Sequence, residues 1–217
     1  MLIIGICLVA DKIRRTEMSA TIMKSRSTEK TLKLVYISMF AAVIVVVQTL
    51  TTFAWPGVIP MNLSLPVIIL GAALFGPKAG AVLGMVFAAI VIWSGVSGQA
   101  PTSAIMWNQS PVIMVLSNLF RGAATGIVAG LGFKLMSKKA VNTQALATCI
   151  IAPIVNTGLF ITTLAVFFRD ILGGNTFLEQ LVATALTLNF ILEMTVNLVM
   201  VTVIAIVINA TRKNKNF

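Results

Sequence analysis

The chain has 217 residues, of which 58% are hydrophobic and only 10% are charged, and its formal net charge is +10. Soluble domains usually contain about 25% charged residues, so this composition excludes an ordinary globular enzyme and a disordered chain. About 20 apolar residues cross a bilayer, so the length allows roughly six or seven spans. The composition therefore indicates a membrane protein with no room for a soluble catalytic domain.

Several kinds of chemistry are excluded by missing residues. Histidine is absent, which removes Ser-His-Asp triads, HExxH zinc sites and the usual haem ligands. The two cysteines, Cys7 and Cys149, predict no disulfide framework. We therefore expect a protein that is not an enzyme and that uses no metal and no cofactor. No basic face interleaved with aromatic residues is present, so we also expect no nucleic-acid partner.

The first 33 residues differ from the rest and predict a cytoplasmic N-terminal extension. The apolar run from Met1 to Ala10 precedes its basic residues, whereas a signal peptide has them first. The run is also too short to span a bilayer. Met18 and Met23 are alternative starts, so residues 1–22 are either a mis-assigned start, a loose extension or an interfacial amphipathic anchor.

The apolar segments that follow predict an all-α membrane protein with six transmembrane helices. We expect these helices at 34–52, 62–75, 79–96, 111–135, 144–168 and 177–209. Together they form a transmembrane domain, 34–209, which a basic cytoplasmic tail, 210–217, follows. Segments 53–60 and 97–110 have the composition of loops, and the second of them predicts a long, adaptable loop.

The basic residues predict the orientation of these helices. With the N-terminus in the cytoplasm, all Lys and Arg residues except Arg121 and Arg169, fourteen of sixteen, lie in cytoplasmic segments. Cytoplasmic loops carry such an excess of Lys and Arg. We therefore expect six spans with both termini in the cytoplasm.

Polar residues recur at membrane depth in the last three predicted helices. Arg121 lies about ten residues into its helix, and Glu193 lies deep in the last one. Since intramembrane polar residues are costly, each one needs a structural or a functional reason. The other polar residues are Asn118, Asn156, Asn189 and Asn197. Asn189, Glu193 and Asn197 share one face because they are four residues apart, so we expect the three helices to line one interior site.

Two interpretations of this pattern remain open. In the structural one, Arg121 and Glu193 neutralise each other and the asparagines hold the helices together. In the functional one, the Arg121 guanidinium binds an anionic or carbonyl group of a small ligand. Glu193 then orients Arg121, or accepts hydrogen bonds from ligand hydroxyl or amide groups.

The predicted outer loops supply further candidate residues. They carry uncharged aromatic and amide side chains: Phe53, Trp55, Trp107, Asn108 and Gln109. The tryptophans fit an interfacial aromatic belt. Alternatively, the rings form a lid over a ligand to which Asn108 and Gln109 donate hydrogen bonds.

Small residues repeat at intervals of four on two of the predicted helices. They are Gly76, Gly80 and Gly84 in one case and Gly122, Gly126 and Gly130 in the other. This spacing predicts close helix packing. Ser38 and Ala42 are a weaker instance on the first helix.

Several segments resemble the substrate-binding S-components of energy-coupling factor (ECF) vitamin transporters. The matching stretches are Leu65–Ile68, Leu74–Gly80, Asn118–Gly122 and Pro153–Phe160. The resemblance covers about residues 30–210, and the Phe-Gly-Pro-Lys-Ala-Gly segment is its most specific part.

This resemblance implies the ECF S-component fold in the cell membrane of a prokaryote. It implies capture of a vitamin at the outer face and docking on a transmembrane coupling subunit that carries two ABC ATPases. ATP hydrolysis by these partners then drives the subunit to topple and to release the vitamin inward. Ser38 and Ala42 match the positions of a helix-1 motif, Ala-x-x-x-Ala, through which many members contact the coupling subunit.

The segment around Asn156 together with Arg121 looks most like the pantothenate members. Arg121 would take the carboxylate of pantothenate, while Asn156 and Asn108 would take its amide or hydroxyl groups. Folate, riboflavin and cobalamin remain alternative ligands. A membrane scaffold subunit without a small ligand is the alternative of a different class.

Overall fold

The computed structural model describes residues 29–54, 62–168 and 188–214, and these are helical apart from short turns. The chain divides into two compact units, residues 1–38 and 39–217. A helix over Glu29–Ala54 comes first. It is followed by α2 (Leu65–Phe75), α3 (Pro77–Val96), α4 (Pro101–Gln109), α5 (Pro111–Leu135), α6 (Val141–Phe167) and α8 (Leu188–Asn214).

Five of these helices are long and apolar enough to cross a membrane, namely Glu29–Ala54, α3, α5, α6 and residues 190–211 of α8. The prediction of an all-helical membrane protein is confirmed at this level. Helix α5 has the predicted bounds, and the other predicted helices differ by a few residues at their ends. Helix α8 continues into the predicted basic tail, and residues 177–187 of the last predicted helix lie outside the described residues.

The prediction of a loop over 97–110 was wrong, because its second half is helix α4. Gly98, with φ +76°, begins the turn between α3 and α4. Pro101 then opens the helix, and proline suits a first helical turn because its ring fixes φ and no N–H is needed there. Thr102, Ser103 and Met106 are buried, so tertiary packing stabilises a helix too short to be stable alone.

Helix α2 is much shorter than its neighbours. Its 11 residues extend about 16 Å at 1.5 Å per residue, about half of a hydrocarbon core of roughly 30 Å. The turn to α3 is a single residue, Gly76, with φ +89°, a conformation that favours glycine. Its N–H donates to Ala72 O at 2.9 Å and ends α2. The two helices therefore form a tight hairpin.

Residues 39–54 of the first helix pack on α2 through two contacts. The Phe40 and Phe75 rings meet edge to face, with centroids 5.9 Å apart. Ser64 Oγ, at the start of α2, donates to Gln48 Oε1 at 2.8 Å, and both residues are buried. One contact is apolar and lies where α2 ends; the other is polar and lies where α2 begins.

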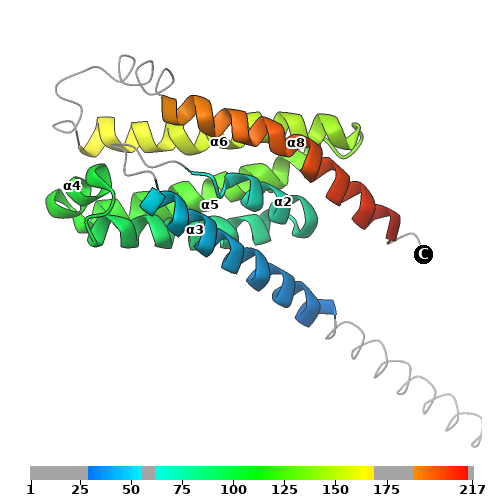
Figure 1. The fold of residues 1–217 in the computed structure, drawn as a ribbon, viewed down its shortest axis with the longest axis horizontal. Helices are drawn as coiled ribbons and strands as arrows, with labels where there is room; N and C mark the ends of the chain where they lie inside the picture. Colours follow the sequence, from blue (N-terminus) through cyan, green and yellow to red (C-terminus); the bar gives the residue numbers. More distant parts are fainter. Residues whose placement is uncertain (1–28, 55–61, 169–187, 215–217) are drawn as a thin grey trace, which may run out of the picture. The chain divides into compact units, whose positions relative to one another are not determined.

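Glycines bring α3 and α5 into backbone contact, as their spacing predicts. A Cβ on Gly84 would meet the backbone of Gly122, and a Cβ on Gly80 would meet that of Gly126. A Cβ on Gly130 would meet Pro77. From Gly84 to Gly80 the contact moves toward the N-terminus of α3, while from Gly122 to Gly126 it moves toward the C-terminus of α5. The two helices therefore run antiparallel (Figure 1). This interface confirms the prediction of close packing.

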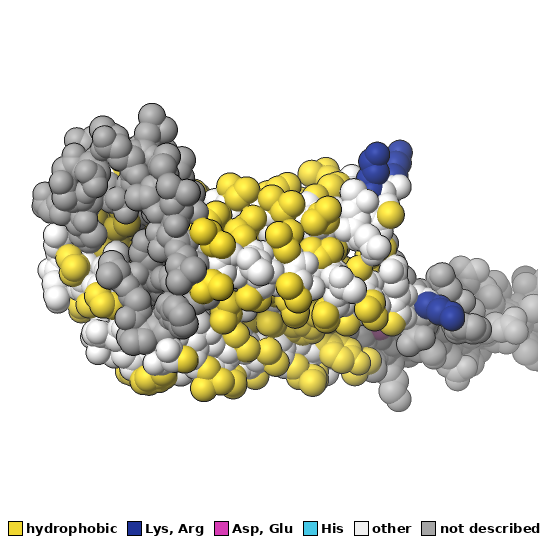
Figure 2. Space-filling view, turned by 45° about the horizontal axis from the view of Figure 1, so that its top comes forward, with side chains coloured by type: hydrophobic (Ala, Val, Ile, Leu, Met, Phe, Trp, Pro, Cys, Tyr) yellow, Lys and Arg dark blue, Asp and Glu magenta, His cyan; other side chains and the backbone are white. Residues whose placement is uncertain are grey.

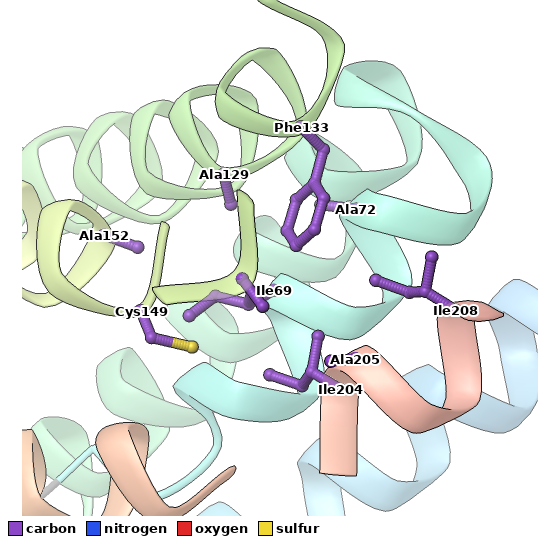
Figure 3. Close-up of a cluster of buried hydrophobic side chains, with 10 residues drawn as sticks. Ile69, Ala72, Ala129, Phe133, Cys149, Ala152, Ile204, Ala205 and Ile208 are labelled. Carbon is purple, nitrogen blue, oxygen red and sulfur yellow. The ribbon is translucent and has the colours of Figure 1, made fainter. Parts of the chain in front are cut away.

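Two apolar clusters occupy different levels of the bundle. The first joins α2, α5, α6 and α8, and Figure 3 shows its side chains converging from these helices. Its members are Ile69, Ala72, Ala129, Phe133, Ala145, Cys149, Ala152, Ile204, Ala205 and Ile208. We call this the aliphatic cluster. The second, here the α4 cluster, consists of Met106, Met114, Phe160, Leu164 and Phe168, with Trp107 packed against it.

The described surface is largely apolar. In the face seen in Figure 2, yellow side chains cover the length of the helices, and the Lys and Arg side chains gather at one end. Large apolar side chains such as Val112, Phe120 and Val199 are more than 60% exposed. Such a surface is costly in water and suits contact with lipid tails.

Candidate functional site: a buried polar layer

A layer of buried polar side chains lies between the two apolar clusters. It consists of Asn62, Asn118, Arg121, Asn156, Glu193 and Asn197, all at most 7% exposed. Asn62 stands just before α2, and the others come from α5, α6 and α8. We call this group the polar layer.

The position of the polar layer follows from the order of residues along the helices. On α5, Asn118 and Arg121 lie between Met114 of the α4 cluster and Ala129 of the aliphatic cluster. On α6, Asn156 lies between Phe160 and Ala152, which belong to the same two clusters. Because both helices change from polar to apolar at corresponding positions, the polar groups of α5 and α6 lie at one level of the bundle.

Arg121 is held by its own helix and by two aromatic rings. Its Nη2 donates to Asn118 Oδ1 at 2.8 Å, and Asn118 Nδ2 in turn donates to Met114 O at 2.8 Å. The guanidinium carbon lies 4.8 Å from the Phe160 ring centroid and 5.9 Å from that of Phe87. A cation over an aromatic face is attracted by the ring quadrupole. The rings and Asn118 thus fix the guanidinium while its Nε stays unpaired among the described residues.

Glu193 is bound by Asn62, which stands just before α2. Asn62 Nδ2 donates to Glu193 Oε2 at 3.3 Å, which joins two residues 131 positions apart. One turn further along α8, Asn197 Nδ2 donates to the backbone carbonyl of Glu193 at 2.8 Å. The Asn62 backbone carbonyl accepts from Leu65 N at 3.2 Å, so Asn62 also forms the first turn that leads into α2.

Arg121 and Glu193 carry opposite formal charges and belong to the same buried layer. No ion pair joins them, however, since none of the described contacts brings a guanidinium nitrogen within hydrogen-bonding reach of the carboxylate. Each is bound to an asparagine instead. The two opposite charges therefore leave part of each group free.

Seven buried polar atoms find no hydrogen-bond partner among the described residues, and six of them belong to the polar layer. These six are Asn62 Oδ1, Arg121 Nε, Asn156 Nδ2, Asn156 Oδ1, Glu193 Oε1 and Asn197 Oδ1. More than nine-tenths of buried polar groups in proteins are paired, and each unpaired one costs about 1–3 kcal/mol. Asn156, with no exposed surface and neither amide atom paired, is the extreme case. Such a concentration is typical of a site that binds a polar ligand.

The structure places the predicted loop residues away from this layer. Trp107 is half-buried against the α4 cluster, while Asn108 and Gln109 are exposed on the last turn of α4. Phe53, at the end of the first helix, is 64% exposed. Trp55 and the side chain of Asn189 lie outside the described residues.

The two predicted docking residues lie on the first helix. Ser38 is exposed and its Oγ donates to Leu34 O at 3.0 Å, one turn earlier. Ala42 is exposed as well. Both positions are small, and neither is covered by the described parts of its own unit.

Sequence reasoning missed three residues of this site. Asn62 was assigned only to the start of a helix, and Phe87 and Phe160 only to apolar spans. Phe160 carried a signal, because it follows Asn156 by four residues and so shares its face of α6. Asn62 and Phe87 carried none, since their contacts join distant parts of the chain.

The described residues bring together no group of three or more Cys, Asp and Glu side chains that would suit a metal ion. Comparisons with models of protein families, with curated proteins and with solved structures find no match for this chain. The polar layer and the resemblance of the sequence motifs therefore carry the functional argument.

Proposed function

We propose that this protein is a membrane-embedded binding subunit for a small water-soluble molecule, and specifically an S-component of an ECF-type vitamin importer. The observation that carries the proposal is the polar layer, which holds six buried polar atoms without a partner among the described residues of an apolar helical bundle. A purely structural layer would pair its groups with one another, because unpaired buried groups are costly. Pantothenate is the best candidate, since it offers a carboxylate, an amide and two hydroxyl groups.

The proposal includes the partners that the resemblance implies. A coupling subunit with two ABC ATPases would supply the energy, and it would dock at Ser38 and Ala42, which are small and exposed. The protein would lie in a prokaryotic cell membrane with both termini in the cytoplasm. The positions of its Lys and Arg residues support this orientation.

Two measurements test the proposal directly. Mass spectrometry of small molecules released from the purified protein should identify a vitamin, and calorimetry with a panel of B vitamins should show saturable binding without ATP. If no vitamin is released and none in the panel binds, the proposal is wrong.

Arg121 provides the residue-level test of the same proposal. Arg121→Ala should weaken binding of an anionic vitamin by about tenfold to a hundredfold, because a hydrogen bond to a charged group contributes about 1.5–3 kcal/mol. Thr148→Val is the matched control, since the Thr148 hydroxyl is buried on α6 and donates to Gln144 O of its own helix. Equal affinity of Arg121→Ala and Thr148→Val would assign Arg121 a structural role.

A further inference from the structure

The unpaired atoms of the polar layer are sorted by chemistry. On the side formed by α8 and the start of α2, all three are oxygens that accept hydrogen bonds: Asn62 Oδ1, Glu193 Oε1 and Asn197 Oδ1. The amide nitrogens of these two asparagines are already used, in bonds to Glu193 Oε2 and to Glu193 O. These bonds fix the orientation of both amides, so the atoms of this side that lack any partner among the described residues are acceptors.

The atoms without a partner on α5 and α6 include donors. Arg121 Nε–H is unpaired, and an arginine has no acceptor. Asn156 adds an unpaired amide nitrogen, together with its own oxygen. Asn118 contributes neither, because both ends of its amide are occupied by Arg121 and by Met114 O. Asn118 is therefore a positioning residue for the guanidinium.

Glu193 offers one carboxyl oxygen to a ligand. Its Oε2 accepts from Asn62 Nδ2, while Oε1 has no partner among the described residues. Asn62 stands just before α2, so the carboxyl group lies near a helix N-terminus, where the helix dipole favours negative charge. A ligand group that carries a hydrogen-bond donor suits Glu193 Oε1.

We infer that the polar layer binds a ligand with two chemically different ends: an anionic or carbonyl acceptor facing Arg121 and Asn156, and a hydrogen-bond donor facing Glu193, Asn197 and Asn62. This inference rests on the proposed binding function and fixes the class and orientation of the ligand. The donor end is a hydroxyl or an amine, because either group can donate hydrogen bonds to the three acceptor oxygens. We expect a ligand with acceptors at both ends, such as a dicarboxylate, to bind more weakly.

The test uses four probes and calorimetry on the full-length protein. Pantothenate has both ends; panthenol replaces its carboxylate by a hydroxymethyl group; N-isovaleryl-β-alanine lacks both hydroxyls and one methyl group; and β-alanyl-β-alanine carries an ammonium at that end. Pantothenate or the dipeptide should bind at least tenfold more tightly than panthenol and N-isovaleryl-β-alanine. A preference for pantothenate identifies the donor end as a hydroxyl, and a preference for the dipeptide identifies it as an amine.

Two substitutions to glutamine then assign the ends. In Glu193→Gln the tenfold advantage of the hydroxyls or ammonium should disappear, while the preference for a carboxylate remains. In Arg121→Gln the preference for a carboxylate should disappear, while the other remains. Because each variant is judged by a ratio of affinities, a general loss of stability does not imitate the result.

Three outcomes would overturn the inference. In the first, the wild-type protein binds none of the four probes. In the second, it binds all four with equal affinity. In the third, both variants lose both preferences. Binding of a different B vitamin together with the first of these outcomes would leave the proposed function standing. Failure of every vitamin in the panel would reject the proposed function as well.

Discussion

At the scale of single residues, the unfavourable free energy of burying unpaired polar groups is greatest at Asn156. Its amide is completely buried on α6 and neither atom has a partner among the described residues. Thr148, two turns earlier on the same helix, is equally buried, but its hydroxyl donates to Gln144 O at 2.8 Å. Both residues are buried, but only Thr148 has a hydrogen-bond partner among the described residues, so the two make a matched pair for experiment.

We predict that Asn156→Leu stabilises the protein in the absence of ligand by about 1–3 kcal/mol, because it replaces a buried unpaired amide by an apolar side chain with the same branching. The same change should abolish stabilisation by the ligand. Thermal unfolding in detergent, with and without ligand, measures both effects. Thr148→Val should leave ligand stabilisation intact, and a lower midpoint for ligand-free Asn156→Leu than for the wild type would contradict the prediction.

The sequence predicted the main charged residues of the site but not their partners. Arg121 and Glu193 stand out because charges are rare in apolar spans. Whether they pair with each other depends on the rotation and depth of α5 and α8, which a hydrophobic pattern does not determine. The contacts of Glu193 with Asn62 and of Arg121 with Phe160 are therefore findings of the structure.

At the scale of helices, the contact between α3 and α5 depends on the absence of side chains at its glycines. Gly84 lies against the backbone of Gly122, so the helices are as close as backbones allow. Without a hydrophobic driving force in lipid, such packing supplies much of the association between helices. Gly158 on α6 differs, since a Cβ there would meet nothing within 4 Å.

Gly84→Ala should destabilise the bundle by about 2 kcal/mol, because its Cβ overlaps a backbone that cannot move without separating the two helices. Gly158→Ala is the control and should change stability by less than about 1 kcal/mol, in keeping with the helix propensities of the two residues. Retention of monodisperse protein after heating, followed by size-exclusion chromatography, compares the variants. If Gly84→Ala is as heat-resistant as Gly158→Ala, the backbone contact contributes little.

Helix α4 is an example of a helix that the sequence pattern does not predict. Its segment contains the Gly, Ser and Pro residues that usually mark loops, and nine residues carry little periodic signal. The spacing of the glycines on α3 and α5, in contrast, predicted their contact correctly. Repeated spacing survives in long helices, while short helices depend on the packing around them.

At the scale of the whole molecule, the proposed orientation predicts which connections face the cytoplasm. Lys139 follows α5 and Ser97 follows α3, so the two connections lie at opposite ends of antiparallel helices. Both side chains are exposed. A single cysteine at either position therefore reports one side of the membrane.

In a background of Cys7→Ser and Cys149→Ala, Ser97→Cys should react with an impermeant maleimide added to intact cells. Lys139→Cys should react only after the membrane is opened or inverted. The physical reason is the excess of basic residues on the cytoplasmic side. Labelling of Lys139→Cys in intact cells would reverse the proposed orientation.

The depth of the polar layer has an electrical consequence. Arg121 lies about 15 Å from the start of α5, which is half the thickness of a hydrocarbon core. The start of α2, next to Asn62, lies at a similar distance from the C-terminal end of α2. A ligand that enters from the α4 side therefore crosses about half of the transmembrane voltage before it reaches Arg121. Since one charge moved across the full membrane corresponds to about 2.3 kcal/mol per 100 mV, a monovalent anion would bind more weakly by about 1 kcal/mol per 100 mV of inside-negative potential. A zwitterion would be insensitive to the voltage, so the energised state of the cell would itself discriminate between an anionic and a zwitterionic ligand.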